Sequence, residues 1–334
     1  MNKPAYRCIF FLIFACCTSR HGQDDTEQPR ADISAKNQEV VKLQGPQTIT
    51  RTIIKDSQGH IWVAAYDGIF RYDGETFTNM TNQVSSARFF SVLEDKKGNF
   101  WFSSVGSGVF YYDGKTFRNF TTDDGLANNR VTEICEDKSG HVWFSTEGGV
   151  SCYDGQTFRN FTTKDGLPNN DVGPIIEDKA GKLWIGTRGD ACIYDGKTFT
   201  VLTHQGKPFQ NVRSIIEDAQ GDIWLGGNDG LWRYDGSTFT HFAQQYVGYV
   251  YEDPHGNIWT STNSDRTKSA QTGLYNNSLQ KGWALSRYDK KALANAAPLP
   301  EIIKTNEGMI FGILEADDGN IWFGTLNGVY RYAS

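Results

Sequence analysis

Residues 89–121 read FFSVLEDKKGNFWFSSVGSGVFYYDGKTFRNFT, and a version of this stretch occurs seven times in the chain. It contains four short runs rich in aromatic and β-branched residues, separated by turn residues such as Lys-Lys-Gly and Asp-Gly. Runs of this kind with tight turns between them are typical of an antiparallel β-meander. Each copy is therefore predicted to form one four-stranded unit.

The seven copies align on a tryptophan in the second run. These residues are Trp62, Trp101, Trp143, Trp184, Trp224, Trp259 and Trp322. They are 39, 42, 41, 40, 35 and 63 residues apart, and a period near forty is typical of propeller blades. A lone four-stranded sheet is marginal in water, but sheets arranged around an axis bury one another's faces. We therefore predict an all-β fold, a single seven-bladed β-propeller of four-stranded antiparallel blades.

The other repeated residues have turn chemistry. A glycine precedes the tryptophan by three residues in all seven copies, and an aspartate precedes it by six in every copy except the last, which has Ala316. Aspartate can bind its own backbone two residues on, while glycine adopts the positive φ of a tight hairpin. We interpret the repeated Trp, Asp and Tyr residues as structural.

The ring needs a strand from the N-terminal side to close. The seventh copy ends at Ser334, directly after its third run. Val41 lies 21 residues before Trp62, as Met80 lies 21 residues before Trp101. Residues near Glu39 to Leu43 are therefore predicted to supply the outer strand of the last blade, in a propeller domain spanning 39–334.

The first forty residues have a different character. Lys3 and Arg7 accompany the apolar segment Cys8–Ala15, which is too short to cross about 30 Å of hydrocarbon as a helix. Ile13–Cys16 resembles a bacterial lipoprotein signal box, which implies cleavage before Cys16 and acylation of its thiol. We expect a signal peptide at 1–15, a flexible tether at 16–38, and a periplasmic or outer-membrane location. An ordinary secretory signal is the alternative.

Composition excludes several classes of function. A net charge of −6 argues against nucleic-acid binding, and contact with a membrane is expected only through the lipid anchor. Cys135, Cys152 and Cys192 have no CxxC spacing, so neither zinc nor a disulfide framework is predicted. The histidine spacing nominates no catalytic triad. We predict no metal site, no cofactor and no catalytic residues, and we favour a non-enzymatic protein.

Ile134–Asn170, ICEDKSGHVWFSTEGGVSCYDGQTFRNFTTKDGLPNN, resembles the two-component-regulator propeller repeat. That repeat occurs in the extracytoplasmic sensor regions of hybrid histidine kinases, and the resemblance extends over roughly Glu39 to Ser334. It implies a ligand-sensing or dimerising propeller. Because this chain ends with the propeller, we expect a sensor-like binding protein without its own kinase output.

Function is expected where the copies differ, on loops around the axis at one face. The candidate ligand-binding residues there are Arg51, Arg88, Phe90, Arg130, Arg188, Asp190, Arg213 and Tyr249. The sixth copy also has an insertion at 263–283, in which Tyr275 and Trp283 are candidate contact aromatics. Arginine with aromatic rings suits carbohydrate-like or anionic small ligands. Solvated loop tips and a tolerated surface excursion are the structural alternatives.

Two other functions stay open. A looser resemblance to seven-bladed streptogramin lyases implies a His and a Glu acting with Mg²⁺ at the central face, where His204 would join Glu133 or Glu147. A docking scaffold for envelope proteins would instead use the blade edges or the insertion.

Overall fold

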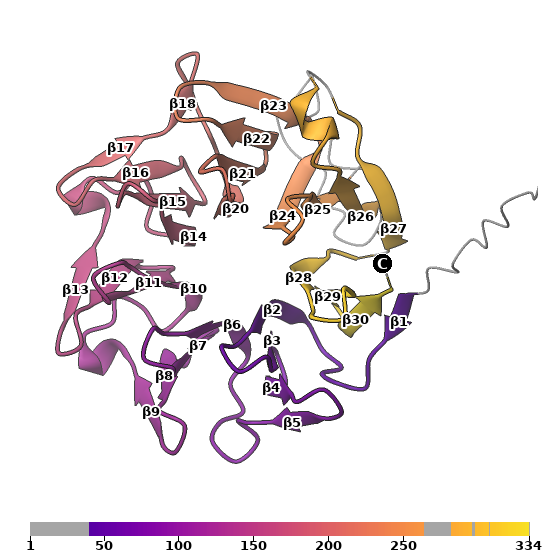
Figure 1. Ribbon diagram of the computed structural model, residues 1–334. Helices are drawn as coiled ribbons and strands as arrows, with labels where there is room; N and C mark the ends of the chain where they lie inside the picture. The colour runs from indigo at the N-terminus through magenta and orange to yellow at the C-terminus, as the bar shows by residue number, and fades with distance from the viewer. Residues whose placement is uncertain (1–39, 264–281, 296–297, 307, 334) are drawn as a thin grey trace, which may run out of the picture. The chain divides into compact units, whose positions relative to one another are not determined.

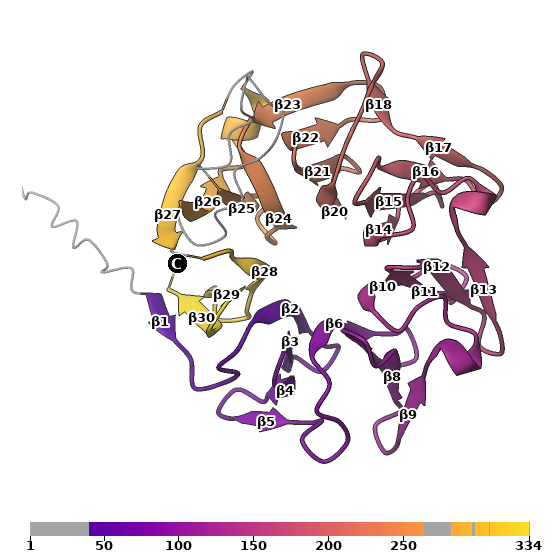
Figure 2. The ribbon, with the colours of Figure 1, turned by 180° about the vertical axis from the view of Figure 1, so that it is seen from behind.

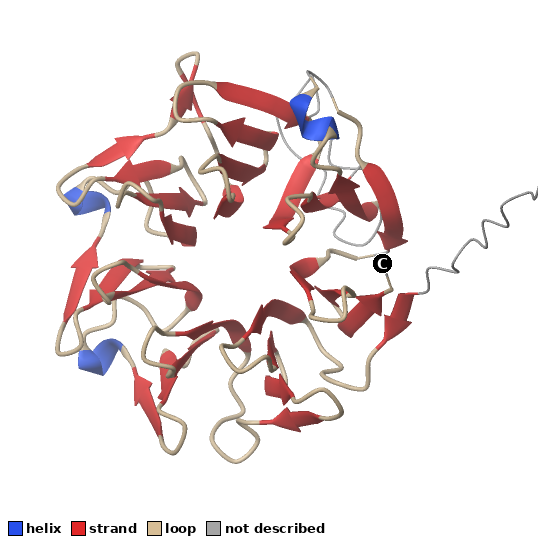
Figure 3. Cartoon of the chain, in the orientation of Figure 1, coloured by secondary structure: helices blue, strands red, loops and turns tan. Residues whose placement is uncertain are grey.

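The computed structural model describes residues 40–263, 282–295, 298–306 and 308–333. In this part of the chain seven four-stranded antiparallel sheets surround a central axis, with the first strand of each blade innermost and the last at the rim (Figures 1 and 2). Strands and loops make up almost the whole ring (Figure 3). The prediction of an all-β seven-bladed propeller is confirmed.

The first four blades follow one another without interruption. Blades 1 and 2 consist of β2 (Thr50–Lys55), β3 (Ile61–Ala65), β4 (Gly68–Tyr72), β5 (Phe77–Asn79), β6 (Phe89–Glu94), β7 (Phe100–Ser104), β8 (Val109–Tyr112) and β9 (Phe117–Phe120). Blades 3 and 4 consist of β10 (Val131–Glu136), β11 (Val142–Thr146), β12 (Gly149–Tyr153), β13 (Phe158–Phe161), β14 (Val172–Glu177), β15 (Leu183–Thr187), β16 (Cys192–Tyr194) and β17 (Phe199–Val201).

The last three blades include the strand that closes the ring. Blades 5 and 6 consist of β20 (Val212–Glu217), β21 (Ile223–Gly227), β22 (Gly230–Tyr234), β23 (Phe239–Ala243), β24 (Tyr246–Glu252), β25 (Ile258–Asn263), β26 (Trp283–Tyr288) and β27 (Glu301–Asn306). Blade 7 consists of β28 (Phe311–Glu315), β29 (Ile321–Thr325), β30 (Gly328–Tyr332) and β1 (Val40–Lys42). Strand β1 pairs antiparallel with β30, Val41 opposite Arg331, so the predicted closure by an N-terminal strand is also confirmed.

The blade connections contain the remaining short elements. The helices of the described residues are 3₁₀ turns: η1 (Thr122–Asp124), η2 (Thr163–Asp165) and η3 (Ala292–Ala294). The first two have a capping box and end on a glycine with positive φ, which explains the recurring TT-x-D-G segment. Between blades 4 and 5 a small hairpin, β18 (Thr203–His204) and β19 (Lys207–Pro208), takes the place of this turn. No helix in the described residues is long and apolar enough to cross a membrane.

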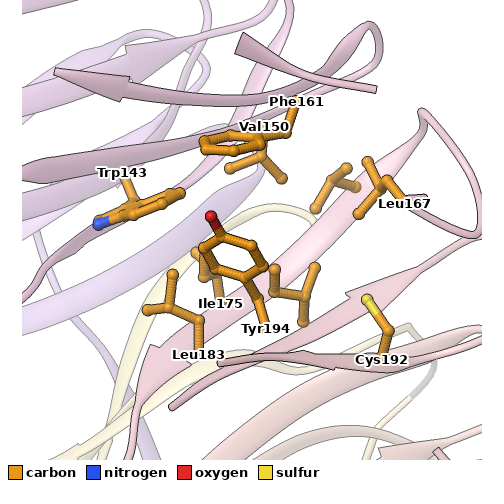
Figure 4. Close-up of a cluster of buried hydrophobic side chains, with 10 residues drawn as sticks. Trp143, Val150, Phe161, Leu167, Ile175, Leu183, Cys192 and Tyr194 are labelled. Carbon is orange, nitrogen blue, oxygen red and sulfur yellow. The ribbon is translucent and has the colours of Figure 1, made fainter. Parts of the chain in front are cut away.

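The hydrophobic core lies between neighbouring blades. Figure 4 shows one such cluster, in which Trp143 and Phe161 of blade 3 pack against Tyr194 and Leu183 of blade 4. Trp143 stacks on Phe161 with ring centroids 5.6 Å apart, and Tyr194 lies 5.3 Å from the same ring. The repeated tryptophan is therefore the apolar residue that joins one sheet to the next.

The repeated aspartate holds that tryptophan in place. In six blades a buried carboxylate accepts a hydrogen bond from the indole Nε1, at 2.7–3.1 Å. In blade 1 the Asp56 carboxylate also accepts the backbone N–H groups of Gln58 and His60. Burial raises the pKa of Asp56, but the bonds from Trp62 and His60 outweigh it, so this pKa lies below its ordinary value.

Blade 7 departs from this arrangement. Ala316 stands where the other blades have aspartate, and the Nε1 of the buried Trp322 has no hydrogen-bond partner. The hairpin itself is kept, since the Ala316 N–H donates to Asn320 O at 2.9 Å and the Asn320 N–H donates to Asp318. The seventh blade thus retains the turn but lacks the acceptor for its tryptophan.

Candidate functional site

Every inner strand carries a β-bulge at the same position of the repeat to within one residue. The bulge includes or adjoins the residue eleven positions before the repeated tryptophan, as Arg51 precedes Trp62. From blade 1 to blade 7 these residues are Arg51, Phe90, Thr132, Gly173, Arg213, Gly248 and Phe311. All seven line one cavity of about 280 Å³, which we call the axial cavity. One register of the repeat therefore supplies the wall of a site at the centre of the ring.

Arg51 lies against two aromatic rings of that register. Its guanidinium carbon lies 3.8 Å from the centroid of Phe90 and 4.2 Å from that of Phe311. Burial lowers the pKa of Arg51 to about 10, so the side chain remains charged at neutral pH. Contact with an aromatic ring leaves the in-plane N–H donors of a guanidinium available to other partners.

A second cation and a carboxyl group face the same space. Arg213 and Arg51 have no ion-pair partner within 4 Å among the described residues. Glu133 accepts a hydrogen bond from Ser91 Oγ at 2.5 Å and one from the Ile134 N–H at 3.2 Å. Burial nevertheless raises the pKa of Glu133, and it also raises that of the Tyr249 hydroxyl. The axial cavity therefore holds two arginines that are in no ion pair with a described residue, together with the carboxyl group of Glu133.

The mouth of the cavity is formed by a second register. There the residue thirteen positions before the tryptophan meets the one four positions after it. In blade 3 these are Arg130 and Glu147, 2.7 Å apart, and in blade 4 they are Asp171 and Arg188, 3.2 Å apart. In each pair the arginine and the carboxylate neutralise one another, so the mouth of the cavity is polar but carries little net charge.

The structure brings six of the ten predicted ligand-binding residues together. Arg51, Phe90, Arg130, Arg188, Arg213 and Tyr249 all line the axial cavity. Arg88 is exposed beside it, with its guanidinium carbon 5.8 Å from the Tyr66 ring. Asp190 does not line the cavity; its carboxylate accepts a bond from Gln210 Nε2 at 3.2 Å between blades 4 and 5.

The insertion of the sixth copy gives a different result. Tyr275 and most of 263–283 lie outside the described residues. Trp283, expected to be a contact aromatic in a polar loop, is instead 0% exposed in β26 and packs edge-on against Tyr246. A large ring at the start of a strand can complete the core of the blade, and Trp283 does so here.

Sequence reasoning missed several residues of the site. Thr132, Gly173, Gly248 and Phe311 share the register of Arg51 but carry no charge that draws attention. The sequence indicates Glu133 only through the lyase-like alternative, as a partner of His204. An alignment of the repeats could have identified the four residues of this register. They all stand eleven positions before the repeated tryptophan, and the residue type at that position varies from copy to copy.

His204 lies away from the axial cavity. It belongs to the β18–β19 hairpin and packs on Trp232, with ring centroids 5.0 Å apart. None of the described residues that line the axial cavity is a histidine. The described residues also contain no group of three or more His, Cys, Asp or Glu that could hold a metal ion.

Fold and site define a seven-bladed propeller with a charged axial cavity. The family model described as "Two component regulator propeller" matches residues 125–148, 166–189, 206–229 and 305–327. These segments hold the first hairpin of blades 3, 4, 5 and 7. Four segments of the chain therefore match the repeat of that family, which confirms the predicted resemblance. The sequence matches no curated protein.

Solved structures share the fold at low identity. The extracellular domain described as part of a hybrid two-component system of B. thetaiotaomicron has a TM-score of 0.71 and 21% identity, over 88% of this chain and 41% of that one. Virginiamycin B lyase from Staphylococcus aureus has a TM-score of 0.67 and 14% identity, over 89% of this chain and 98% of that one. PorZ, a surface component of the type-IX secretion system of Porphyromonas gingivalis, has a TM-score of 0.60 and 16% identity, over 83% of this chain and 46% of that one. The chain spans about two-fifths of the sensor domain's length.

Proposed function

We propose that this protein is an exported, non-enzymatic binding module that recognises a small carbohydrate-like or anionic ligand in its axial cavity. The observation that carries the proposal is the convergence of one repeat register on that cavity, whose lining includes Arg51, Arg213 and the rings of Phe90 and Phe311. Structural repeats keep their residues alike where packing requires it. Variation at one register is instead expected where a ligand is bound.

The location belongs to the same proposal. The apolar segment Cys8–Ala15 and the adjacent Cys16 support export and a lipid anchor in the periplasm or outer membrane. The sensor domain with the same fold is described as extracellular, which agrees with this location. Metabolic labelling with palmitate should mark the wild-type protein and leave a Cys16→Ala variant unlabelled.

A cavity-filling variant tests the binding role. A Cβ atom on Gly173 would meet its nearest neighbours, the carbonyl oxygens of Gly186 and Val212, at 3.7 Å, which is ordinary contact. Phe90 already occupies the equivalent position in blade 2, so the bulge accepts a large side chain there. Gly173→Leu should fold normally and fill part of the cavity.

The assay is a glycan array and a panel of small metabolites, screened by thermal shift and calorimetry. At least one ligand should bind the wild type and lose its binding in Gly173→Leu, while the melting temperature of the unliganded variant stays close to wild type. If no ligand behaves in this way, the axial cavity is not the binding site.

Two alternatives give different results. A lyase-like activity has the shared fold in its favour, but the described lining of the cavity lacks the histidine that the resemblance implies. Turnover of a streptogramin that needs Mg²⁺ and is lost on chelation would support it. A docking scaffold would co-purify with an envelope protein whose binding is unchanged in Gly173→Leu.

A further inference from the structure

The strongest feature that the proposed function leaves unexplained is the pair of cations, Arg51 and Arg213, in the lining of the axial cavity. Arg51 and Arg213 come from blades 1 and 5, and each is half-buried. Elsewhere in the cavity the arginines have partners, since Arg130 binds Glu147 and Arg188 binds Asp171. The two inner arginines have no carboxylate within ion-pair distance among the described residues.

We propose that Arg51 and Arg213 form an anion subsite, which takes the carboxylate of an acidic sugar or another small oxyanion. This inference rests on the proposed function and specifies its ligand. A partly desolvated cation without an ion-pair partner is costly, and a bound anion would supply that partner. The repulsion between the two guanidinium groups, which contributes to the lowered pKa of Arg51, would be relieved at the same time.

The geometry selects the kind of anion. Phe90 and Phe311 both lie against the Arg51 guanidinium, and the edge of a guanidinium offers two parallel N–H donors that fit a carboxylate or phosphate. The cavity of about 280 Å³ lies at the lower end of the size range of small-molecule sites, so the ligand has about the size of one sugar ring.

Among the described residues that line the cavity, Glu133 is the carboxyl group that is in neither ion pair, and its own hydrogen bonds limit its competition with a ligand. Its Oε1 already accepts from Ser91 Oγ and from the Ile134 N–H. The ion pairs at the mouth are closed within their own blades, so they do not draw the anion away from the inner arginines. Their polar atoms remain available to hydroxyl groups of the same ligand.

The test uses a pair of probes that differ in one group. D-glucuronate and D-glucose have the same ring, and only the first carries a carboxylate. Calorimetry should give glucuronate an affinity at least about tenfold higher, the loss expected when a charge-assisted hydrogen bond is absent. Inorganic phosphate and sulfate, titrated separately, distinguish a free oxyanion from an acidic sugar as the source of the charge.

Variants of two arginines test which residue causes the preference for glucuronate over glucose. Arg213→Gln should remove the preference for glucuronate, whereas Arg159→Gln should keep it. Arg159 is the matched control, because its guanidinium also stacks on a ring, that of Phe161 at 4.5 Å, but on an outer strand. Arg213→Met is the second variant if Arg213→Gln melts early. A merely structural arginine would change the melting temperature without changing the ratio of the two affinities.

Each outcome is decisive. Equal affinity for glucose and glucuronate, with both lost in Gly173→Leu, overturns the anion subsite and keeps the proposed function. Failure of all four probes to bind at millimolar concentration overturns the subsite. Tight glucuronate binding that survives Gly173→Leu overturns both, because the ligand then binds outside the axial cavity.

Discussion

The seventh blade, which lacks the repeated aspartate, allows the contribution of that aspartate to the free energy of unfolding to be measured directly. Trp322 is 3% exposed and its Nε1 has no acceptor, while six equivalent tryptophans donate to a carboxylate. We predict that Ala316→Asp restores this bond and stabilises the protein. The turn already has the required backbone, since the Gly319 N–H donates to Ala316 O at 2.9 Å, as the Gly221 N–H does to Asp218 O.

The magnitude follows from the bonds gained. A hydrogen bond to a charged group contributes about 1.5–3 kcal/mol. Desolvation of the new carboxylate and repulsion from Asp317 and Asp318 reduce this gain. The second oxygen of the introduced carboxylate also accepts fewer backbone hydrogen bonds than its equivalents in other blades, because the Asn320 N–H already donates to Asp318 at 3.0 Å. We expect a net gain of about 1–2 kcal/mol, or roughly 2–4 °C in Tm for a domain of this size.

The assay is urea unfolding of a double-mutant cycle with Trp322→Phe. The Phe variant loses the Nε1 donor, and its lost packing against Tyr72 and Phe77 cancels in the cycle. The coupling energy between the two positions should be at least about 1 kcal/mol. If Ala316→Asp changes stability equally with Trp and with Phe at position 322, the reasoning about a missing acceptor is wrong.

The remaining predictions concern pH, ring closure and ligand charge. Asp56 and Asp137 have pKa values below the ordinary range because their hydrogen bonds outweigh the effect of burial. The stability that they contribute is therefore present above about pH 4 and is lost as the pH falls through their pKa values in the folded protein. The urea midpoint of unfolding should drop over this range, and it should drop less in Asp56→Asn. Deleting residues through Gly45 removes β1 and should lower Tm by about 10 °C, whereas deletion only to residue 37 should leave Tm unchanged. Since burial raises the pKa of Glu133, glucuronate affinity measured by calorimetry should fall as the pH rises through that pKa, and Glu133→Gln should bind more tightly at neutral pH with a flatter profile. An affinity for glucuronate that does not change with pH in the wild type would contradict the last of these.

The local chemistry of the repeat could be predicted from the sequence because it depends on residues close together in the chain. The Asp–Trp bond joins residues six apart, and the Tyr72 hydroxyl donates to Gly74 O two residues away. Such contacts recur with the repeat, so seven blades and their strand order could be inferred. Ring closure was also predictable, since Val41 has the same spacing to its tryptophan as Met80 has.

The composition of the axial cavity was only partly predictable. Most of its charged residues could be named, since an arginine at the start of an inner strand is visible in the sequence. That Trp283 is a core residue was not visible, because the polar insertion before it suggested an exposed loop.

The sequence by itself therefore determined the blades, their number and the strand that closes the ring, through short-range bonds repeated in each copy. Only the tertiary structure showed that Arg51 lies against both Phe90 and Phe311, and that Arg51 and Arg213 share one cavity without an ion-pair partner among the described residues. These residues are far apart in the chain and meet only when seven sheets close around an axis. Proximity at that axis is a property of the whole ring, and no single repeat contains it.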